Sequence, residues 1–176
     1  MQHGLIDYSD LLGMLQSITG SNVTPIVRVP WLDPGYIMKA LDAGAQGIIS
    51  PMINNKKEAE EFVSYMRYPP LGNRSFGPTR QNIVQGSDYY KTANENVLCI
   101  AMIETAEAMK NLEEIISTDG LDAVYIGPAD LSLAMGEKPS FDKPEGDPVY
   151  DVIMKILDHA KKNNIIAGIQ NGQPEY

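Results

Sequence analysis

The feature that most constrains the fold of this chain is a regular alternation of short apolar runs with longer amphipathic segments. The 176-residue sequence contains five such runs, at 25–29, 47–52, 97–103, 123–126 and 165–169. Short, nearly continuous apolar runs are typical of strands that are buried on both faces, as in parallel sheets. We therefore predict an α/β fold in which five parallel strands are separated by helices that cover both faces of the sheet.

The segments between the runs carry helix signals. Asp33 is a favourable N-cap residue, Pro34 suits the first helical position, and Gly44 marks the end of that helix. Apolar residues at helical spacing predict three further helices, at about 55–67, 106–117 and 148–162.

Two segments interrupt this alternation. Residues 68–86 are too rich in Pro, Gly and Asn for regular structure, and residues 133–146 form a second segment of this kind. Long loops in compact domains are usually functional or mobile, and because both segments follow strand ends, both could wall a site there. Arg74 in the first loop could meet an anionic substrate tail, but a solvated loop arginine is the simpler interpretation.

Composition narrows the class of protein. The formal charge of -9 and the lack of a Lys/Arg cluster argue against nucleic-acid binding. The single cysteine, Cys99, excludes an internal disulfide and fits a reducing compartment. No run is long enough to span a membrane, and the N-terminus lacks the pattern of a signal peptide. We expect one cytoplasmic domain, residues 1–176, with no membrane partner.

Two carboxylates follow two of the predicted strands. Glu104 comes directly after the run 97–103, and Asp130 follows 123–126 through a Gly-Pro-Ala turn. If both runs are parallel strands of one barrel, both acids lie at its carboxyl-terminal rim, where such barrels place their chemistry. Two acids there suggest a hard divalent cation whose other ligands are water and substrate. The alternative is that Glu104-Thr105 and Ala129-Asp130 simply open the helices that follow, as caps.

Several motifs, taken together, resemble the HpcH/HpaI aldolase family of metal-dependent class II pyruvate aldolases. They are RVPWLDP, GAQGIISPMI, YPPLGNRSFGP, AMIETAEAMKNLEEI and GLDAVYIGPADLSLAMG. The resemblance implies a (β/α)8 TIM barrel of roughly 250 residues, and for the full-length parent a homo-oligomer, usually a hexamer. It also implies an incomplete barrel here, in which strand 1, most of strand 2, and strand 8 are missing.

The resemblance assigns roles to residues of this sequence. Glu104 and Asp130 match the family's ligands for Mg²⁺, Mn²⁺ or Co²⁺. The backbone N–H groups of Ala129 and Asp130 match those that hold the pyruvate carboxylate. Arg28 matches the arginine that faces the keto oxygen.

The acid–base pair of the family also has counterparts here. His3 matches the general-base histidine, and Asp42 matches the acid that pairs with it. The chain departs from the family pattern at two positions. Met102, two residues before Glu104, stands where a family member has a glutamine, and no acid is visible before Gln2-His3. If the resemblance is set aside, the sequence favours other interpretations: His3 as a frayed surface residue near the terminus, and Asp42 as part of an exposed charge pair with Lys39.

Arg28 is the only charged residue in its apolar run. A buried arginine is costly unless it is paired, so the alternative to a catalytic role is a structural ion pair. The metal-dependent mechanism does not need a lysine that forms a Schiff base with the substrate. The lysines on the predicted helices are interpreted as solvated, which argues weakly against a Schiff-base aldolase.

The activity that the resemblance implies is reversible aldol cleavage of a 2-keto-4-hydroxy acid to pyruvate and an aldehyde, through a metal-stabilised pyruvate enolate. Its partners are therefore a small keto acid and an aldehyde. One alternative is a carbon–carbon lyase acting on CoA thioesters, like the citrate-lyase β subunit. Another is an inert barrel fragment that only binds metal and keto acid.

Overall fold

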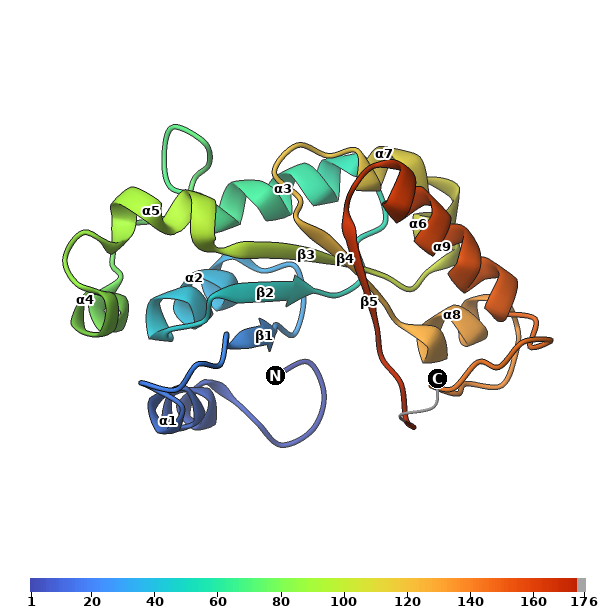
Figure 1. Ribbon diagram of the computed structural model, residues 1–176, viewed down its shortest axis with the longest axis horizontal. Helices are drawn as coiled ribbons and strands as arrows, with labels where there is room; N and C mark the ends of the chain where they lie inside the picture. The colour runs from blue at the N-terminus through green and yellow to red at the C-terminus, as the bar shows by residue number, and fades with distance from the viewer. Residues whose placement is uncertain (174–176) are drawn as a thin grey trace. The chain divides into compact units, whose positions relative to one another are not determined.

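The computed structural model describes residues 1–173 and has an α/β fold with a five-stranded parallel sheet (Figure 1). The strands follow the order of the chain across the sheet. They are β1 (Ile26–Arg28), β2 (Gly47–Ser50), β3 (Leu98–Ile103), β4 (Ala123–Ile126) and β5 (Ile166–Ile169). All five predicted strands are therefore confirmed, with ends that differ by at most two residues.

The chain divides into two compact units. The first comprises Met1–Pro51 and Glu61–Cys99, and the second comprises Met52–Glu60 and the residues from Ile100 onward. Helix α3 (Lys56–Met66), predicted at 55–67, contains residues of both units. Each unit is described by itself.

In the first unit, β1 pairs with β2 in parallel, with Arg28 opposite Ile49. Helix α2 (Pro34–Ala43) packs against β2 and against the neighbouring helices α1 (Tyr8–Ser17) and α4 (Thr79–Gln85). The predicted cap of α2 is confirmed, because the Asp33 carboxylate accepts the Tyr36 N–H at 3.0 Å. Apolar side chains such as Ile37 and Leu41 are completely buried on the inner face of α2.

The first unit also contains helices that we did not predict. α1 begins with a capping box in which Asp7 and Asp10 each accept the other's backbone N–H. The spacing of these two acids is a sequence signal from which this helix could have been predicted. α5 (Tyr89–Asn96) precedes β3. The prediction of irregular structure over 68–86 is wrong for α4, because the prolines of this segment and all of its glycines except the C-cap Gly86 lie before Thr79. The buried Gln81 amide donates to the Ala45 carbonyl at 3.2 Å and fixes α4 on the unit.

In the second unit, β3, β4 and β5 form parallel pairs, with Ile103 opposite Ile126 and Ile126 opposite Ile169. Helix α9 (Tyr150–Lys162), predicted at 148–162, lies against β4 and β5 (Figure 1). The helix predicted at 106–117 is instead two short helices, α6 (Ala106–Lys110) and α7 (Leu112–Ile116), which meet at Asn111. Across residues 1–173, no helix combines the length and apolar character that crossing a membrane requires.

The cap of α2 supports a prediction about stability. Asp33→Ala should lower the free energy of unfolding by about 1 kcal/mol, because the Tyr36 N–H loses its acceptor at the helix start. Urea unfolding followed by circular dichroism measures the change. Asp119→Ala removes an exposed carboxylate that does not cap a helix and should have an effect below about 0.5 kcal/mol. Equal effects of the two substitutions would contradict the cap.

Candidate active site

Glu104 and Asp130 lie at the same edge of the sheet, within the second unit. The register of β3 and β4 brings Gly127 beside the end of β3, where its N–H donates to the Ile103 carbonyl at 3.2 Å. Glu104 follows Ile103 directly, and Asp130 lies in the first turn of α8 (Pro128–Ala134). This placement agrees with the prediction made from the strand ends.

The Glu104 carboxylate is buried, and neighbouring backbone groups fix its orientation. Glu104 is 1% exposed, and its Oε1 accepts the backbone N–H of Met52 at 2.8 Å. A Cβ on Gly127 would lie only 2.5 Å from Glu104 Oε2 and 2.9 Å from Glu104 Cβ. Glycine is therefore required at 127 for space, since its φ of -101° is open to any residue.

The capping alternative is confirmed for Thr105 but does not apply to either acid. The N-cap of α6 is Thr105, whose hydroxyl accepts the Ala108 N–H at 2.9 Å. The N-cap position of α8 is Gly127, and no side chain caps that helix. Asp130 lies inside the first turn of α8 and is exposed. Both carboxylates are thus available for a role other than capping.

The two acids fit a hard divalent cation that takes most of its ligands from elsewhere. Among residues 1–173, no three His, Cys, Asp or Glu side chains cluster as a complete metal cage. Two carboxylates at one sheet edge supply hard oxygen ligands, and water and a chelating substrate would complete the coordination. The Gly127 backbone packs so closely against Glu104 Oε2 that a side chain at 127 would collide with it, and this close packing suits a carboxylate that must be held in one orientation.

Ala129 precedes Asp130 in α8 and belongs to the second unit, whereas the remaining predicted site residues belong to the first unit. Arg28 is the last residue of β1 and is half-buried. His3 is exposed and precedes α1. No hydrogen bond or ion pair joins His3 to Asp42 in the described part of the chain, so their predicted pairing stays a prediction.

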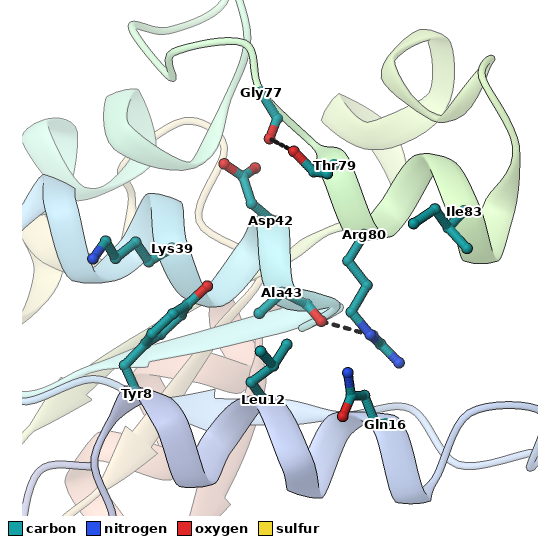
Figure 2. A pocket seen from close by; sticks show the side chains of 10 residues that line it. All are labelled: Tyr8, Leu12, Gln16, Lys39, Asp42, Ala43, Gly77, Thr79, Arg80 and Ile83. Carbon is teal, nitrogen blue, oxygen red and sulfur yellow. Dashed lines mark hydrogen bonds between the residues drawn. The ribbon is translucent and has the colours of Figure 1, made fainter.

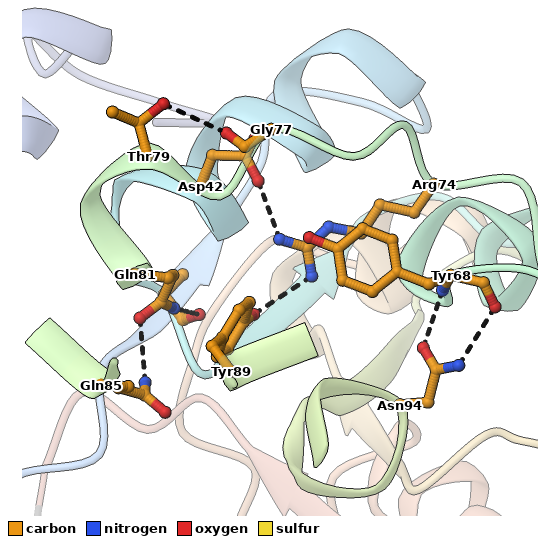
Figure 3. A network of polar contacts seen from close by, with 10 residues as sticks. Asp42, Tyr68, Arg74, Gly77, Thr79, Gln81, Gln85, Tyr89 and Asn94 are labelled. Atoms are coloured by element: carbon orange, nitrogen blue, oxygen red, sulfur yellow. Dashed lines mark hydrogen bonds and ion pairs between the residues drawn. The ribbon is translucent and has the colours of Figure 1, made fainter. Parts of the chain in front are cut away.

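Asp42 instead forms an ion pair with Arg74 (Figure 3). The distance from Arg74 Nη2 to Asp42 Oδ1 is 2.8 Å, and Arg74 Nη1 lies 3.1 Å from the Tyr89 hydroxyl. The guanidinium lies over the Tyr68 ring, 4.4 Å from its centroid. The predicted exposed pair of Asp42 with Lys39 is therefore wrong, since Lys39 lies over the Tyr8 ring instead.

Our interpretation of Arg74 as a solvated loop residue is also wrong, because its side chain is fully buried. The loop folds back onto α3 and its end: Asn73 N–H donates to the Ser64 carbonyl at 2.8 Å, and Arg74 N–H to the Arg67 carbonyl at 2.9 Å. A buried guanidinium must be paired, and the Asp42 carboxylate and the Tyr89 hydroxyl supply that pairing.

Burial also shifts the ionisation of the groups around Arg74. Burial raises the pKa of Asp42, and the hydrogen bond and charge of Arg74 only partly oppose this rise. Burial raises the pKa of Tyr68 to about 12, again against the opposing charge of Arg74. The Tyr68 hydroxyl is buried without a hydrogen-bond partner among the described residues, so its neutral form is strongly favoured.

A cavity of about 400 Å³ opens in the first unit between α1, α2 and α4 (Figure 2). Asp42 is the only predicted site residue in its lining. Arg80 at its wall donates to the Ala43 carbonyl at 2.7 Å and to the Leu15 carbonyl at 3.1 Å, so it ties the ends of α2 and α1 together.

Comparison with known proteins identifies the family. The family model described as HpcH/HpaI aldolase/citrate lyase matches residues 4–171. The chain belongs to this family. The match covers both units and contains every predicted site residue except His3, which lies just before it.

Similar proteins include named aldolases. The hydroxypyruvate/pyruvate aldolase of Rhizorhabdus wittichii is 43% identical over 172 residues, which are 98% of this chain and 66% of that protein. The 4-hydroxy-2-oxo-heptane-1,7-dioate aldolase of Escherichia coli is 37% identical over 171 residues, which are 94% of this chain and 64% of that protein. The chain thus spans slightly less than two thirds of the length of these relatives.

A solved structure shows the same fold. The crystal structure of the citrate synthase SbnG has a TM-score of 0.85 and 29% identity to this chain, and the alignment covers 99% of this chain and 67% of that one. The α/β arrangement of this chain is therefore shared with that citrate synthase over the aligned residues.

The sequence did not indicate three residues that shape the site. Met52 donates to Glu104 through its backbone, so no side-chain pattern marks it. Gly127 was visible in the turn before Asp130, but the need for glycine comes from the neighbouring strand. Arg74 was visible as well, and its burial depends on how the loop folds back.

The buried ion pair leads to a prediction about stability. Asp42→Asn should lower the free energy of unfolding by roughly 3 kcal/mol, because it leaves the Arg74 charge buried without its counter-ion. Glu60→Gln makes the same acid-to-amide change in the exposed Lys56–Glu60 pair and should cost less than about 0.5 kcal/mol. Urea unfolding of both variants tests this contrast, and a small effect of Asp42→Asn would refute it.

The Tyr68 hydroxyl leads to a prediction about alkaline pH. Because the pKa of Tyr68 is raised to about 12 in the folded state and is about 10 when unfolded, the folded state holds the proton more tightly. The free energy of unfolding should therefore fall by about 1–2 kcal/mol between pH 10 and 12 on account of this group. Tyr68→Phe should remove that part of the loss while remaining as stable as the wild type at pH 7. The measurement is urea unfolding at several pH values, and parallel pH curves for the two proteins would contradict the assignment.

Proposed function

We propose that this chain carries the site of a divalent-metal-dependent class II pyruvate aldolase. The reaction is cleavage of a 2-keto-4-hydroxy acid to pyruvate and an aldehyde, and the reverse condensation. The observation that carries the proposal is the position of Glu104 and Asp130 at the ends of two paired strands. Family membership and the aldolase names of the relatives support it.

Glu104 and Asp130 would hold the cation, which can be Mg²⁺, Mn²⁺ or Co²⁺. When bound, such a cation supplies a Lewis acid that polarises a ketone oxygen without proton transfer. Glu104 contributes a buried carboxylate whose orientation the Met52 N–H fixes. Asp130 contributes an exposed carboxylate in the first turn of α8.

Substrate orientation is assigned to the neighbouring backbone and to Arg28. The N–H groups of Ala129 and Asp130 would bind the carboxylate of pyruvate, and their helix start has no side-chain cap that competes for them. Arg28 would place a fixed positive charge beside the keto oxygen, where negative charge develops during cleavage.

Proton transfer is assigned to His3 as the general base for the hydroxyl of the substrate. Histidine is the side chain that most often serves as a general base in enzymes, because its imidazole can both accept and donate a proton. We retain Asp42 as the proposed partner of His3. Arg74 contacts its Oδ1, so Oδ2 is the oxygen assigned to the imidazole.

We further propose that residues 1–176 belong to one domain, a (β/α)8 barrel that functions as a homo-oligomer. The relatives named above are longer than this chain by about a third of their own length, which supports a barrel with additional strands. A closed barrel needs a consistent strand number, tilt and shear, so five strands would be a part of it.

Pyruvate release from 4-hydroxy-2-oxo acids, coupled to lactate dehydrogenase, tests the proposed function. Activity should require Mn²⁺ or Mg²⁺, be abolished by EDTA, and fall on the order of 100-fold or more in Glu104→Gln. Glu107→Gln, an exposed acid in the next helix, should retain wild-type activity.

Carbon–carbon cleavage of an added CoA-thioester substrate, with release of acetyl-CoA or another shorter CoA thioester and no pyruvate release from the 4-hydroxy-2-oxo acids, would favour the citrate-lyase alternative. Metal binding that Glu104→Gln removes, without turnover of any of these substrates, would favour the inert fragment. Activity that survives both EDTA and Glu104→Gln would rule out the metal-dependent mechanism.

A further inference from the structure

Met52 adopts a backbone conformation that methionine rarely takes. Its φ is 57°, and Asn164 is the only other non-glycine residue with a positive φ among residues 1–173. Asparagine tolerates the left-handed region better than most residues do, whereas methionine gains nothing there from its own side chain. Such a conformation persists only where the surroundings hold it, and it is common next to functional sites.

The left-handed turn directs both polar groups of the Met52 backbone to specific partners. Its N–H donates to Glu104 Oε1 at 2.8 Å, and its carbonyl accepts the Asn54 side-chain amide, also at 2.8 Å. Between these residues, Ile53 is completely buried and anchors the segment in the second unit. The segment that follows β2 is therefore tied to the acid that follows β3.

Asn54 connects this segment to the chain on the other side of Glu104. Its side-chain oxygen accepts the hydroxyl of Thr105, the residue directly after Glu104. Its backbone carbonyl accepts the Asn111 amide at 2.8 Å, and its N–H donates to Glu58 Oε2 at 2.7 Å. Asn54 thus holds both the Met52 carbonyl and the backbone that carries Glu104.

We propose that Met52 and Asn54 are positioning residues that fix the plane of the Glu104 carboxylate for metal binding. The Met52 N–H holds Oε1, while Oε2 lies toward Gly127, at the start of the turn that carries Asp130. Partners that orient a metal ligand in this way typically change metal affinity by roughly 10–100-fold when removed. This inference rests on the proposed metal site at Glu104 and Asp130.

The backbone conformation of Met52 can be tested apart from its side chain. Met52→Gly and Met52→Val both remove the methionine side chain, but glycine adopts a positive φ readily and a β-branched residue does not. The inference requires that Met52→Gly bind Mn²⁺ within about twofold of the wild type. It requires that Met52→Val bind roughly tenfold or more weakly.

Asn164→Val is the matched control, because it places the same β-branched residue at the other positive φ, in the turn before β5. Like Met52→Val, it should lower the thermal stability, but it should leave the Mn²⁺ affinity unchanged. Asn54→Ala removes the amide that holds the Met52 carbonyl and should also weaken Mn²⁺ binding, which gives a second reading if Met52→Val does not fold.

The experiment is a Mn²⁺ titration of the 176-residue chain, followed by electron paramagnetic resonance of the unbound ion, with a thermal melt of each variant without metal. If the wild type binds no Mn²⁺, or if Glu104→Gln binds as well as the wild type, the proposed site is wrong and this inference fails with it. If the wild type binds and Glu104→Gln does not, wild-type affinity in Asn54→Ala or in a folded Met52→Val overturns the positioning role alone.

Discussion

The parallel pairing of β3 with β4 is the constraint on which the candidate site depends. Because Ile103 lies opposite Ile126, the residues that follow the two strands emerge side by side, and Gly127 donates its N–H to the last carbonyl of β3. A slip of one residue would move every side chain of a strand to the other face. The register therefore fixes both the position of Glu104 and the need for glycine at 127.

A second constraint is that each buried charged side chain needs a polar partner. Glu104 is almost completely buried, and a buried carboxylate needs hydrogen bonds, one of which the Met52 N–H donates to its Oε1. In the first unit the same rule applies to Arg74, which is paired with Asp42 and lies over the Tyr68 ring. In both places a loop brings together a buried charged side chain and its polar partner.

The sequence supported much of the fold because its signals are local. The apolar runs located all five strands, and Asp33, Pro34 and Gly44 located the ends of α2. The errors have local causes as well. Asn111 divides the helix predicted at 106–117. The segment at 68–86, predicted to be irregular, contains α4 because its prolines and all of its glycines except the C-cap Gly86 precede Thr79.

By itself, the sequence determined the class of fold and the position of Glu104 and Asp130 after two strands, because strand periodicity and chain order fix these features. The family followed from the resemblance of its motifs, and the family match confirms it. Only the tertiary structure decided how Glu104 is held and what Asp42 and Arg74 contact. Met52 acts through its backbone, and Arg74 is buried by a loop that folds back onto residues 64–67. Contacts of this kind join segments distant in sequence, and the residue types at either end do not specify them.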